Sequence, residues 1–595
     1  MKKQLRNKEA VILLTAFSIP IIWFAVLAAQ CCGEGIKLFG FLENLSEILK
    51  TPYRLKITPY TGKCVLICLC CYGLGISAYY SSKGNKRIGE EYGSAKWGNA
   101  AELNKKYKDT KNPENNAILT KNIQIGLDGR KHRRNLNILV VGGSGSGKTR
   151  FFVKPNIMQC NCSYIVADPK GELLRATGGM LEKQGYIVKV LNLVDMTHSD
   201  GYNPLAYIHT DTDALKLVTN LIKNTTPKTA GNTDPFWDKS ETALLQAFIL
   251  YLKYEAPISE QNFSTVMYMV QNAAASENNE DYKSPMDVIF EALEEREPEH
   301  IAVKQYKVFK QAAGKTAKSI LISTAVRLAA FNLSQFAAIT NNDEMELDKL
   351  GQRKQAIFAV IPDNDSSFNY IVGMLYTQAF QELYYHADHK SGGRLNVPVR
   401  VLMDEFANVA LPDDFEKVLA TCRSREISIN IIIQNMAQLK ALFKDSWENV
   451  TGNCDTFLYL GGNEQGTHKY ISELMGKATI DTKTKGITKG RNGSSSTNYQ
   501  NAGRELLTPD EVRLLDNEYA IVFIRGERAA TDKKYDIMKH KNVKLTEDGG
   551  AASYTKIMKF LDKEPEYDFS SEDFTREMNI EDIEILEFDF KEEKQ

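Results

Sequence analysis

Apolar residues follow three patterns along this chain. Two uncharged runs near the N-terminus, about residues 10–29 and 64–80, have nearly the length that crosses a bilayer. From residue 91 the chain turns polar, and between about 211 and 346 the apolar spacing is helical, as in 240–252. On both sides of that stretch, short apolar runs have the length of buried strands: 136–141, 163–168, 187–191, 356–361, 399–403, 429–433 and 519–524. The pattern predicts a membrane anchor and a parallel α/β sheet, interrupted by an all-helical insertion.

Basic residues flank the two apolar runs. Lys2, Lys3, Arg6 and Lys8 precede the first run, and Lys83, Lys86 and Arg87 follow the second, as in a hairpin with both ends in the cytoplasm. The charge rule is not decisive, because the connecting loop also carries five bases: Lys37, Lys50, Arg54, Lys56 and Lys63. A cleaved signal peptide is the rival interpretation of the first run, although residues 28–31 make a poor cleavage or lipidation site.

A glycine-rich motif directly follows the apolar run 136–141. It consists of Gly142, Gly143, Ser144, Gly145, Ser146, Gly147, Lys148 and Thr149. A strand, a glycine-rich turn and a helix form the context of a phosphate-binding P-loop, whose backbone N–H groups curl around a polyphosphate. Lys148 is expected to reach the β and γ phosphates, and the hydroxyl of Thr149 to bind Mg²⁺. The sequence therefore predicts an ATP and Mg²⁺ site. Both are cytoplasmic, which places everything after Tyr80 in the cytoplasm.

Two acids end the apolar run 399–403. In P-loop ATPases such a strand is the Walker B element, in which Asp404 would hold Mg²⁺ through water and Glu405 would polarise the attacking water. Asp168 is the competitor, since it also ends an apolar run. Its neighbour is Pro169 and not a second acid, so we prefer Asp404.

Three further polar residues are candidates for the reaction. Gln434 ends the run 429–433 and is placed to sense a γ-phosphate. Arg423 or Arg425 is placed to reach the ATP of a neighbouring subunit and to stabilise charge in the transition state. A surface salt bridge is the equally favoured alternative for either arginine.

Composition adds little to this picture. The 595 residues carry 74 Lys and Arg against 75 Asp and Glu, so any basic surface for nucleic acid must be local. The ten cysteines have no metal-binding spacing and are expected to be reduced, and His386 and His389 are expected to be exposed helix residues, not metal ligands.

The segment 482–504 is one local basic region. It contains Lys483, Lys485, Lys489, Arg491 and Arg504 among Gly, Ser and Asn. This segment fits either a loop that binds phosphates without sequence specificity or a surface insertion. Tyr499 is its only aromatic residue, which is too few for a base-stacking surface.

The order of the motifs resembles that of the type IV secretion coupling proteins, the TraG/TraD/VirD group, which are relatives of the FtsK-like DNA motors. The resemblance covers nearly the whole chain, and several motifs in the right order are far more specific than one. The matching segments are 92–98, 137–149, 168–172, 202–205, 234–237, 403–406, 423–434 and 503–509.

The resemblance implies a RecA/FtsK-like P-loop ATPase that forms a membrane-anchored hexameric ring, with ATP between subunits. Members use ATP to recruit a relaxase bound to DNA, and they drive single-stranded DNA toward a type IV channel during conjugation. The implied division is an anchor at 1–90, a nucleotide-binding domain at 91–210 and 347–545, a helical insertion at 211–346, and an acidic tail at 546–595. The short outer loop fits a Gram-positive mobile-element version.

Two other functions are compatible with parts of this sequence. One is a receptor that selects protein substrates for secretion and uses ATP for assembly; the presence of both Lys148 and Glu405 favours the motor over it. The other is a double-stranded DNA pump, which would usually carry a longer membrane domain and a winged-helix reader.

Overall fold

The computed structural model describes most of the chain. The described residues are 2–33, 38–82, 89–226, 235–274, 282–312, 314–362, 365, 367–412, 414–487 and 495–556. They fall into two units: one holds residues 1–94 and 477–504, and the other holds 95–476 and 505–595. The predicted tail from 557 on lies outside the described residues, as do six of the bases named above: Lys37, Lys83, Lys86, Arg87, Lys489 and Arg491.

The N-terminal part of the first unit is a pair of antiparallel helices, α1 (Lys2–Gln30) and α3 (Thr61–Ser82), with a short helix α2 (Leu38–Ile48) between them. The Tyr72 hydroxyl donates to the Leu14 carbonyl at 2.9 Å, and Thr58 Oγ1 donates to the Ala29 carbonyl at 3.1 Å. Among the described residues, Thr61–Tyr79 is the helix that is long and apolar enough to span a membrane, while Leu14–Gln30 is a shorter apolar stretch. The second predicted span is thus better supported than the first.

The first unit also contains a two-stranded antiparallel ribbon, β10 (Lys477–Ile487) and β11 (Ser495–Glu505). Its base pairs with the segment that follows the helices, through a bridge between Ser94 and Ala478 and a bond from the Tyr92 N–H to Thr479 Oγ1 at 3.1 Å. The basic region 482–504, which we predicted as a loop, is therefore largely strand where it is described. The Lys483 ammonium lies 5.3 Å from the centre of the Tyr499 ring.

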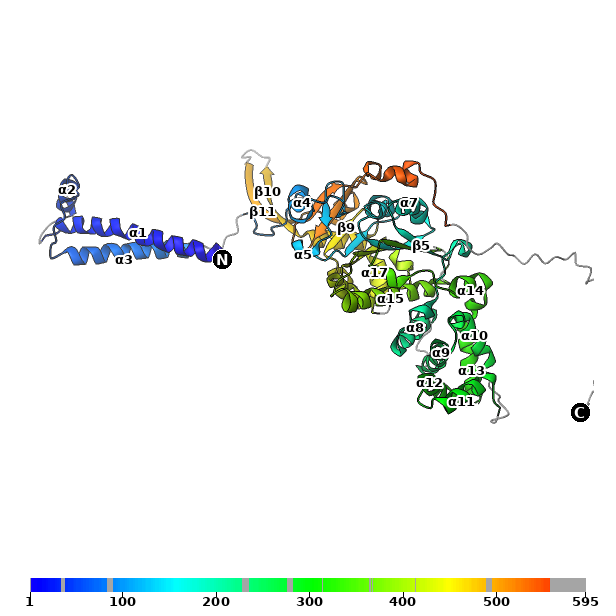
Figure 1. Cartoon of the computed structure of the whole chain (residues 1–595). Coiled ribbons are helices and arrows are strands. Elements are labelled where there is room, and N and C mark those ends of the chain that lie inside the picture. The colour runs from blue at the N-terminus through cyan, green and yellow to red at the C-terminus, as the bar shows by residue number, and fades with distance from the viewer. Residues whose placement is uncertain are drawn as a thin grey trace, which may run out of the picture. The chain divides into compact units, whose positions relative to one another are not determined.

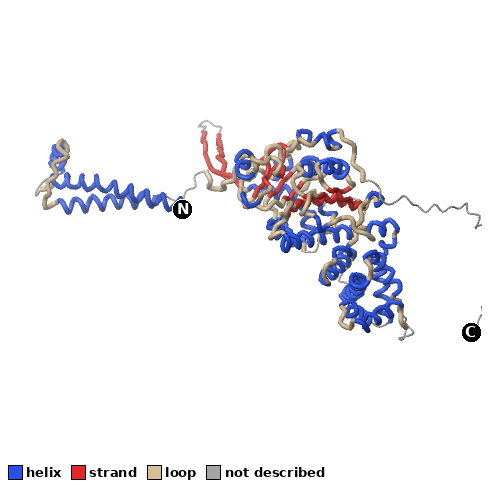
Figure 2. The backbone as a smooth tube through the Cα atoms, viewed as in Figure 1, coloured by secondary structure: helices blue, strands red, loops and turns tan. Residues whose placement is uncertain are grey.

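A nine-stranded sheet forms the centre of the second unit (Figures 1 and 2). Its strand order is β13-β12-β9-β3-β8-β7-β4-β6-β5. The strands are β3 (Ile138–Val141), β4 (Ser163–Pro169), β5 (Ile187–Asn192), β6 (Gln355–Ile361), β7 (Val399–Met403), β8 (Ile427–Ile433), β9 (Thr456–Tyr459), β12 (Tyr519–Ile524) and β13 (Ala530–Lys533). Strands β9 to β5 in this order are parallel, whereas β12 and β13 are antiparallel to their neighbours. The sheet is mixed, which the apolar run 519–524 alone did not reveal because a run has no direction.

Alternate residues of the buried strands enter two separate cores. Leu139, Ile165 and Val401 pack on the face that carries α8 (Asp211–Thr225) and α15 (Asn369–Tyr385). Val140, Val166 and Leu402 pack on the other face, which carries α6 (Lys154–Met158) and α7 (Glu172–Lys183). Because both faces are covered, these strands read as continuous apolar runs and not as alternating ones.

Helices cover both faces of the sheet and occupy its connections. Outside the insertion they are α4 (Ala100–Tyr107), α5 (Gly129–His132), η1 (Thr149–Val153), α6 (Lys154–Met158), α7 (Glu172–Lys183), α15 (Asn369–Tyr385), α16 (Phe415–Thr421), α17 (Met436–Phe443), α18 (Trp447–Gly452), α19 (Gln465–Met475) and α20 (Pro509–Arg513). A small ribbon of β1 (Asn116–Ile118) and β2 (Gln124–Gly126) precedes the sheet.

The described residues between β5 and β6 contain helices and no strand. They form α8 (Asp211–Thr225), α9 (Pro235–Glu255), α10 (Phe263–Asn272), α11 (Pro285–Arg296), α12 (Ile301–Lys310), α13 (Gly314–Arg327) and α14 (Ser334–Thr340). Reciprocal capping bonds fix the starts of α8, at Thr210 and Asp213, and of α11, at Ser284 and Asp287. Figure 1 shows α9 to α13 gathered into a lobe beside the sheet.

The first residues of the predicted acidic tail pack against the sheet domain. The Tyr554 hydroxyl donates to Glu182 at 2.7 Å, and the Lys556 ammonium pairs with Asp200 at 2.9 Å. The Tyr554 ring lies against Gly178, where a Cβ atom would come within 2.6 Å of it. Residues 551–556 therefore belong to the packed domain.

Candidate functional site

The P-loop turns sharply between β3 and η1. Gly145 and Gly147 have φ angles of 76° and 80°, a left-handed conformation that L side chains rarely adopt. The first turn after the loop, Thr149–Val153, is π-helical and leads into α6. The predicted sequence of strand, glycine turn and helix is present.

Neighbouring strands hold the start of the loop. The Gly142 N–H donates to the Ile433 carbonyl at 3.1 Å, and the Gly143 N–H donates to the Gly461 carbonyl at 2.8 Å. The buried Ser146 hydroxyl has no partner among the residues described. A buried polar group without a partner is costly in free energy, and this hydroxyl is available to a phosphate oxygen.

The P-loop meets β7 through one side-chain contact. Thr149 Oγ1 donates to Asp404 Oδ2 at 2.8 Å, and Asp404 is almost fully buried. Burial raises the pKa of Asp404, while the Thr149 bond and the Lys148 charge act in the opposite direction. Burial likewise lowers the pKa of Lys148, and Asp404 and Glu405 oppose that shift. A divalent cation would stabilise this buried carboxylate, so the pair Thr149 and Asp404 fits Mg²⁺.

Glu405 lies at a strained position beside this pair. Its φ of 49° is left-handed, and its carboxylate accepts a bond from Asn408 Nδ2 at 3.2 Å. Strained backbone of this kind is concentrated at functional sites. Glu405 is half-exposed and remains accessible to water.

Asp168 lies beside Asp404 in the sheet, since β4 pairs with β7 and Ala167 is opposite Met403. Its two carboxylate oxygens accept bonds from the N–H groups of Leu173, at 3.0 Å, and Leu174, at 2.7 Å. Burial raises the pKa of Asp168 to about 7. Asp168 is thus occupied in capping α7, which supports the preference for Asp404 as the metal-binding acid.

A cavity of about 570 Å³ opens above the P-loop. Gly143 to Ser146 form one side, Gln434 lies at the end of β8, and the other walls are contributed by residues 461–464 together with Arg513 and Asn517. Because Val141 is opposite Ile433, Gln434 follows directly beside the loop. The predicted Gln434 therefore shares this cavity with the loop, and Arg513 and Asn517 were missed because no local motif surrounds them.

The two candidate arginines have different environments. Arg425 is paired with Asp388 at 2.7 Å, and its guanidinium lies 4.1 Å from the centre of the Tyr384 ring. Arg423 is exposed and forms no ion pair with any described residue. It precedes β8, at the opposite end of that strand from Gln434, so it cannot reach the P-loop of its own chain.

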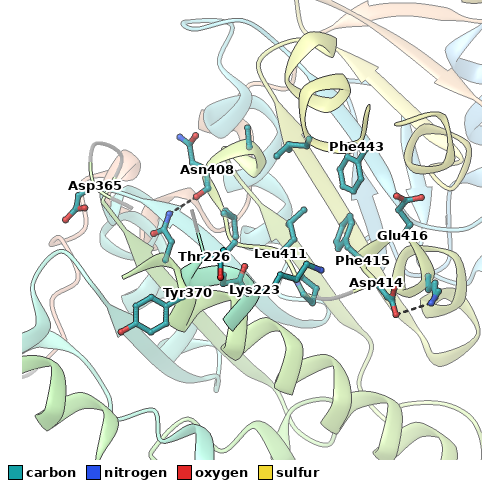
Figure 3. A pocket seen from close by; sticks show the side chains of 18 of the residues that line it. Lys223, Thr226, Asp365, Tyr370, Asn408, Leu411, Asp414, Phe415, Glu416 and Phe443 are labelled. Carbon is teal, nitrogen blue, oxygen red and sulfur yellow. Dashed lines mark hydrogen bonds and ion pairs between the residues drawn. The ribbon is translucent and has the colours of Figure 1, made fainter. Parts of the chain in front are cut away.

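A second, larger hollow of about 1020 Å³ lies beyond Glu405 (Figure 3). One wall is the segment after β7, including Asn408 and Leu411, and another is the start of α15. The Asn369 amide donates to the Asn408 carbonyl at 2.9 Å. Asn408 thus joins Glu405 to the rim of this hollow.

The prediction that His386 and His389 are both exposed was wrong for His386. His386 is buried and bonds to Gln352, whereas His389 is exposed and stacks on Tyr385. His386 follows α15 directly and faces the core. Over the described ranges, no group of three or more His, Cys, Asp or Glu side chains is arranged to hold a metal ion.

Comparison with known proteins gives consistent results. The family model described as type IV secretory system conjugative DNA transfer matches residues 90–560. VirD4 of Rhizobium radiobacter is 24% identical over 404 residues, which are 65% of this chain and 55% of that protein. The conjugal transfer protein TraG of Escherichia coli is 23% identical over 397 residues, or 64% of this chain and 62% of TraG. The chain thus spans little more than half the length of these relatives.

Solved structures show the same fold. The bacterial conjugative coupling protein TrwBdeltaN70, in complex with sulphate, aligns with a TM-score of 0.53 at 14% identity, over 74% of this chain and 93% of that one. The plasmid coupling protein TrwB in complex with ADP and Mg²⁺ aligns with a TM-score of 0.52, at the same identity and coverage. The expected P-loop fold with an α/β sheet is confirmed.

Proposed function

We propose that this chain, which belongs to the type IV secretory system conjugative DNA-transfer family, is an ATPase that couples DNA to a type IV secretion channel. The contact between Thr149 and Asp404 is the observation that carries the proposal. It joins the two halves of a P-loop ATPase site inside the residues that the family model matches.

ATP is the proposed substrate and Mg²⁺ the proposed cofactor. The backbone N–H groups of the P-loop and the Lys148 ammonium bind the phosphates, and Thr149 with Asp404 would hold Mg²⁺. When bound, Mg²⁺ neutralises charge that develops on the phosphate oxygens. Glu405 accepts the proton of the attacking water, and Gln434 orients the terminal phosphate from the end of β8.

Arg423 is proposed to act on a neighbouring subunit. It has no ion-pair partner among the described residues and lies at the far end of β8 from its own P-loop, whereas Arg425 is held by Asp388. An arginine that completes a neighbour's site requires a head-to-tail interface between subunits, which a closed ring provides. The proposed homohexamer follows the resemblance described above.

The helices α1 and α3 are proposed to anchor the chain in the cell membrane as a two-pass hairpin with the ATPase in the cytoplasm. The apolar helix Thr61–Tyr79 supports this placement. The proposed division remains 1–90 for the anchor, 91–210 and 347–545 for the nucleotide-binding domain, 211–346 for the insertion and 546–595 for the tail. The Gram-positive origin stays a prediction.

DNA, a relaxase and the channel proteins are the proposed partners. Single-stranded DNA bound without sequence preference requires flexible cations, and the ribbon of β10 and β11 supplies Lys483 and Lys485. The family match supports DNA as the cargo.

The test is the ATPase rate of the full chain in nanodiscs, with and without single-stranded DNA, and with Lys148→Ala as the blank. Hydrolysis that DNA stimulates and that Lys148→Ala abolishes is the expected result. Hydrolysis that ignores DNA but responds to a secreted protein would favour the receptor. Unchanged hydrolysis in Lys148→Ala would contradict the site assignment itself.

A further inference from the structure

Lys534 is a buried lysine directly beside the P-loop. It follows β13, and its side chain points inward in register with Ala530 and Asp532, while Thr531 and Lys533 point outward. Its ammonium donates to the Ser146 carbonyl at 2.9 Å and to Asn517 Oδ1 at 2.9 Å. A lysine 388 positions away in sequence therefore contacts the backbone of the phosphate-binding loop.

The bond to the Ser146 carbonyl fixes one peptide group of the loop. In a planar trans peptide the C=O and the following N–H point in opposite directions. Because the Ser146 carbonyl faces Lys534, the Gly147 N–H points away from Lys534 and is available to a phosphate of a nucleotide bound in the loop. A cation on the carbonyl oxygen also polarises this peptide and makes its N–H a stronger donor.

The aromatic ring of Phe151 packs against the same turn. A Cβ atom at Gly147 would collide with the Phe151 ring, and the Phe151 N–H donates to the Gly147 carbonyl at 2.7 Å. The Lys534 ammonium lies 5.3 Å from the centre of that ring. Lys534 thus contacts both the peptide before Gly147 and the ring that excludes a side chain there.

The charge of Lys534 has no close counter-ion. Among the residues that the structure describes, it forms no ion pair, and Asp516 is the acid whose charge acts on it. Glu518, in the same turn, is paired with Lys533. Of the other nearby cations, Arg513 lines the cavity above the loop, and the Lys148 ammonium donates to the Gly143 carbonyl at 3.4 Å. Burying an ammonium without a counter-ion is unfavourable even when it is hydrogen-bonded, and a bound polyphosphate relieves that cost.

We propose that Lys534 is a positioning residue for nucleotide phosphates, which acts by holding the Ser146–Gly147 peptide with its N–H toward the bound anion. This inference rests on the proposed nucleotide site and goes beyond it, since no motif contains Lys534. The role is binding and not bond cleavage, so its loss weakens ADP and ATP alike.

The pH dependence of binding follows from burial. Burial lowers the pKa of Lys534 to about 8, so below that pH the ammonium donates both bonds and above it the charge is lost. Nucleotide affinity should therefore fall as the pH rises through this range. An arginine, which stays charged, should keep its affinity.

The experiment measures the dissociation constant of Mg-ADP for the full chain in nanodiscs, at about pH 7 and about pH 9.5. Lys534→Met should weaken binding about 10-fold at the lower pH and should flatten the pH dependence. It should also raise the KM for ATP with little change in kcat. Lys533→Met, an exposed neighbour, is the matched control and should bind as the wild type does.

The outcomes separate this role from a structural one. Equal Mg-ADP affinity in Lys534→Met and the wild type, or an unchanged pH profile, would overturn the proposal. If Lys534→Met does not fold, Lys534→Arg decides. At the higher pH this variant must bind Mg-ADP more tightly than the wild type. If its affinity falls between the two pH values as much as that of the wild type, the proposal is overturned. Lys148→Ala tests the site itself. If Lys148→Ala binds Mg-ADP normally, the assignment of the nucleotide site is wrong. If Lys148→Ala weakens binding but Lys534→Met does not, only the role proposed for Lys534 is contradicted.

Discussion

Thr149 and Asp404 are 255 positions apart in sequence, yet the hydroxyl of one donates to the carboxylate of the other at 2.8 Å. β3 and β7 are not neighbours in the sheet, because β8 lies between them. The contact exists because all three strands are parallel and end at the same edge.

This contact gives the first prediction. Thr149→Val keeps the shape of the side chain but removes the oxygen. The rate of ATP hydrolysis should therefore fall by about 10- to 100-fold, and a higher Mg²⁺ concentration should be needed for half-maximal activity. Thr149→Ser keeps the oxygen and is the matched control. Mg²⁺ titrations of the ATPase rate measure both. Equal Mg²⁺ requirements in the two variants would remove Thr149 from the metal site.

Glu405→Gln should separate binding from turnover. The amide cannot accept the proton of the attacking water, so kcat should fall by about 10²- to 10⁴-fold while ATP still binds. Rapid-quench kinetics measure the fall in turnover, and equilibrium binding measures whether ATP affinity is retained. The variant Asp168→Asn tests the competing metal-binding acid: a large loss of kcat there, with Asp404→Asn active, would reverse the preference for Asp404.

Arg423→Ala should abolish hydrolysis at the ATP site of the neighbouring subunit and leave the P-loop of its own chain intact. The expected loss for a finger that stabilises transition-state charge is about 10³- to 10⁵-fold. Mixing Arg423→Ala with Lys148→Ala should restore hydrolysis, since some interfaces then combine an intact P-loop with an intact Arg423. Arg425→Ala, whose side chain is held by Asp388, is the control and should remain active. No recovery in verified mixed oligomers would exclude a role in trans.

His540 should make the domain less stable in acid. Its Nδ1 faces the N–H of Asn542 at 3.2 Å and its Nε2 faces Gln159 Oε1 at 3.2 Å, an arrangement that suits the neutral ring. Burial lowers the pKa of His540 to about 4, below the ordinary value of 6.5. The stabilisation is therefore complete above pH 6.5 and is lost as the pH falls toward 4, by up to about 3 kcal/mol.

Thermal unfolding of His540→Asn across this range is the measurement. Asn keeps an acceptor for the Asn542 N–H but does not titrate, so the melting temperature should depend less on pH than in the wild type. His389→Asn, at an exposed position, is the control for a histidine substitution outside the core. A variant His540→Asn with the wild-type pH slope would show that this ring is not responsible.

The sequence by itself determined the elements whose signals are local. A P-loop needs glycines at a fixed spacing, a lysine and a hydroxyl after an apolar strand, so residues 142–149 were identified from spacing alone, as was the strand that precedes Asp404. The helical spacing between 211 and 346 was equally readable, because periodicity is a property of neighbouring residues.

The tertiary structure decided what depends on strand order and burial. The ribbon of β10 and β11 has no apolar alternation, so its polar sequence read as a loop, and His386 read as exposed because burial is set by distant segments. Lys534 follows a strand of only four residues, too short to stand out, although Ala530, Asp532 and Lys534 alternate inward. Its place next to Ser146 arises because β12 turns back beside β9 and carries β13 to the edge of the sheet. Contacts between segments hundreds of residues apart follow from the order of strands, which no local pattern encodes.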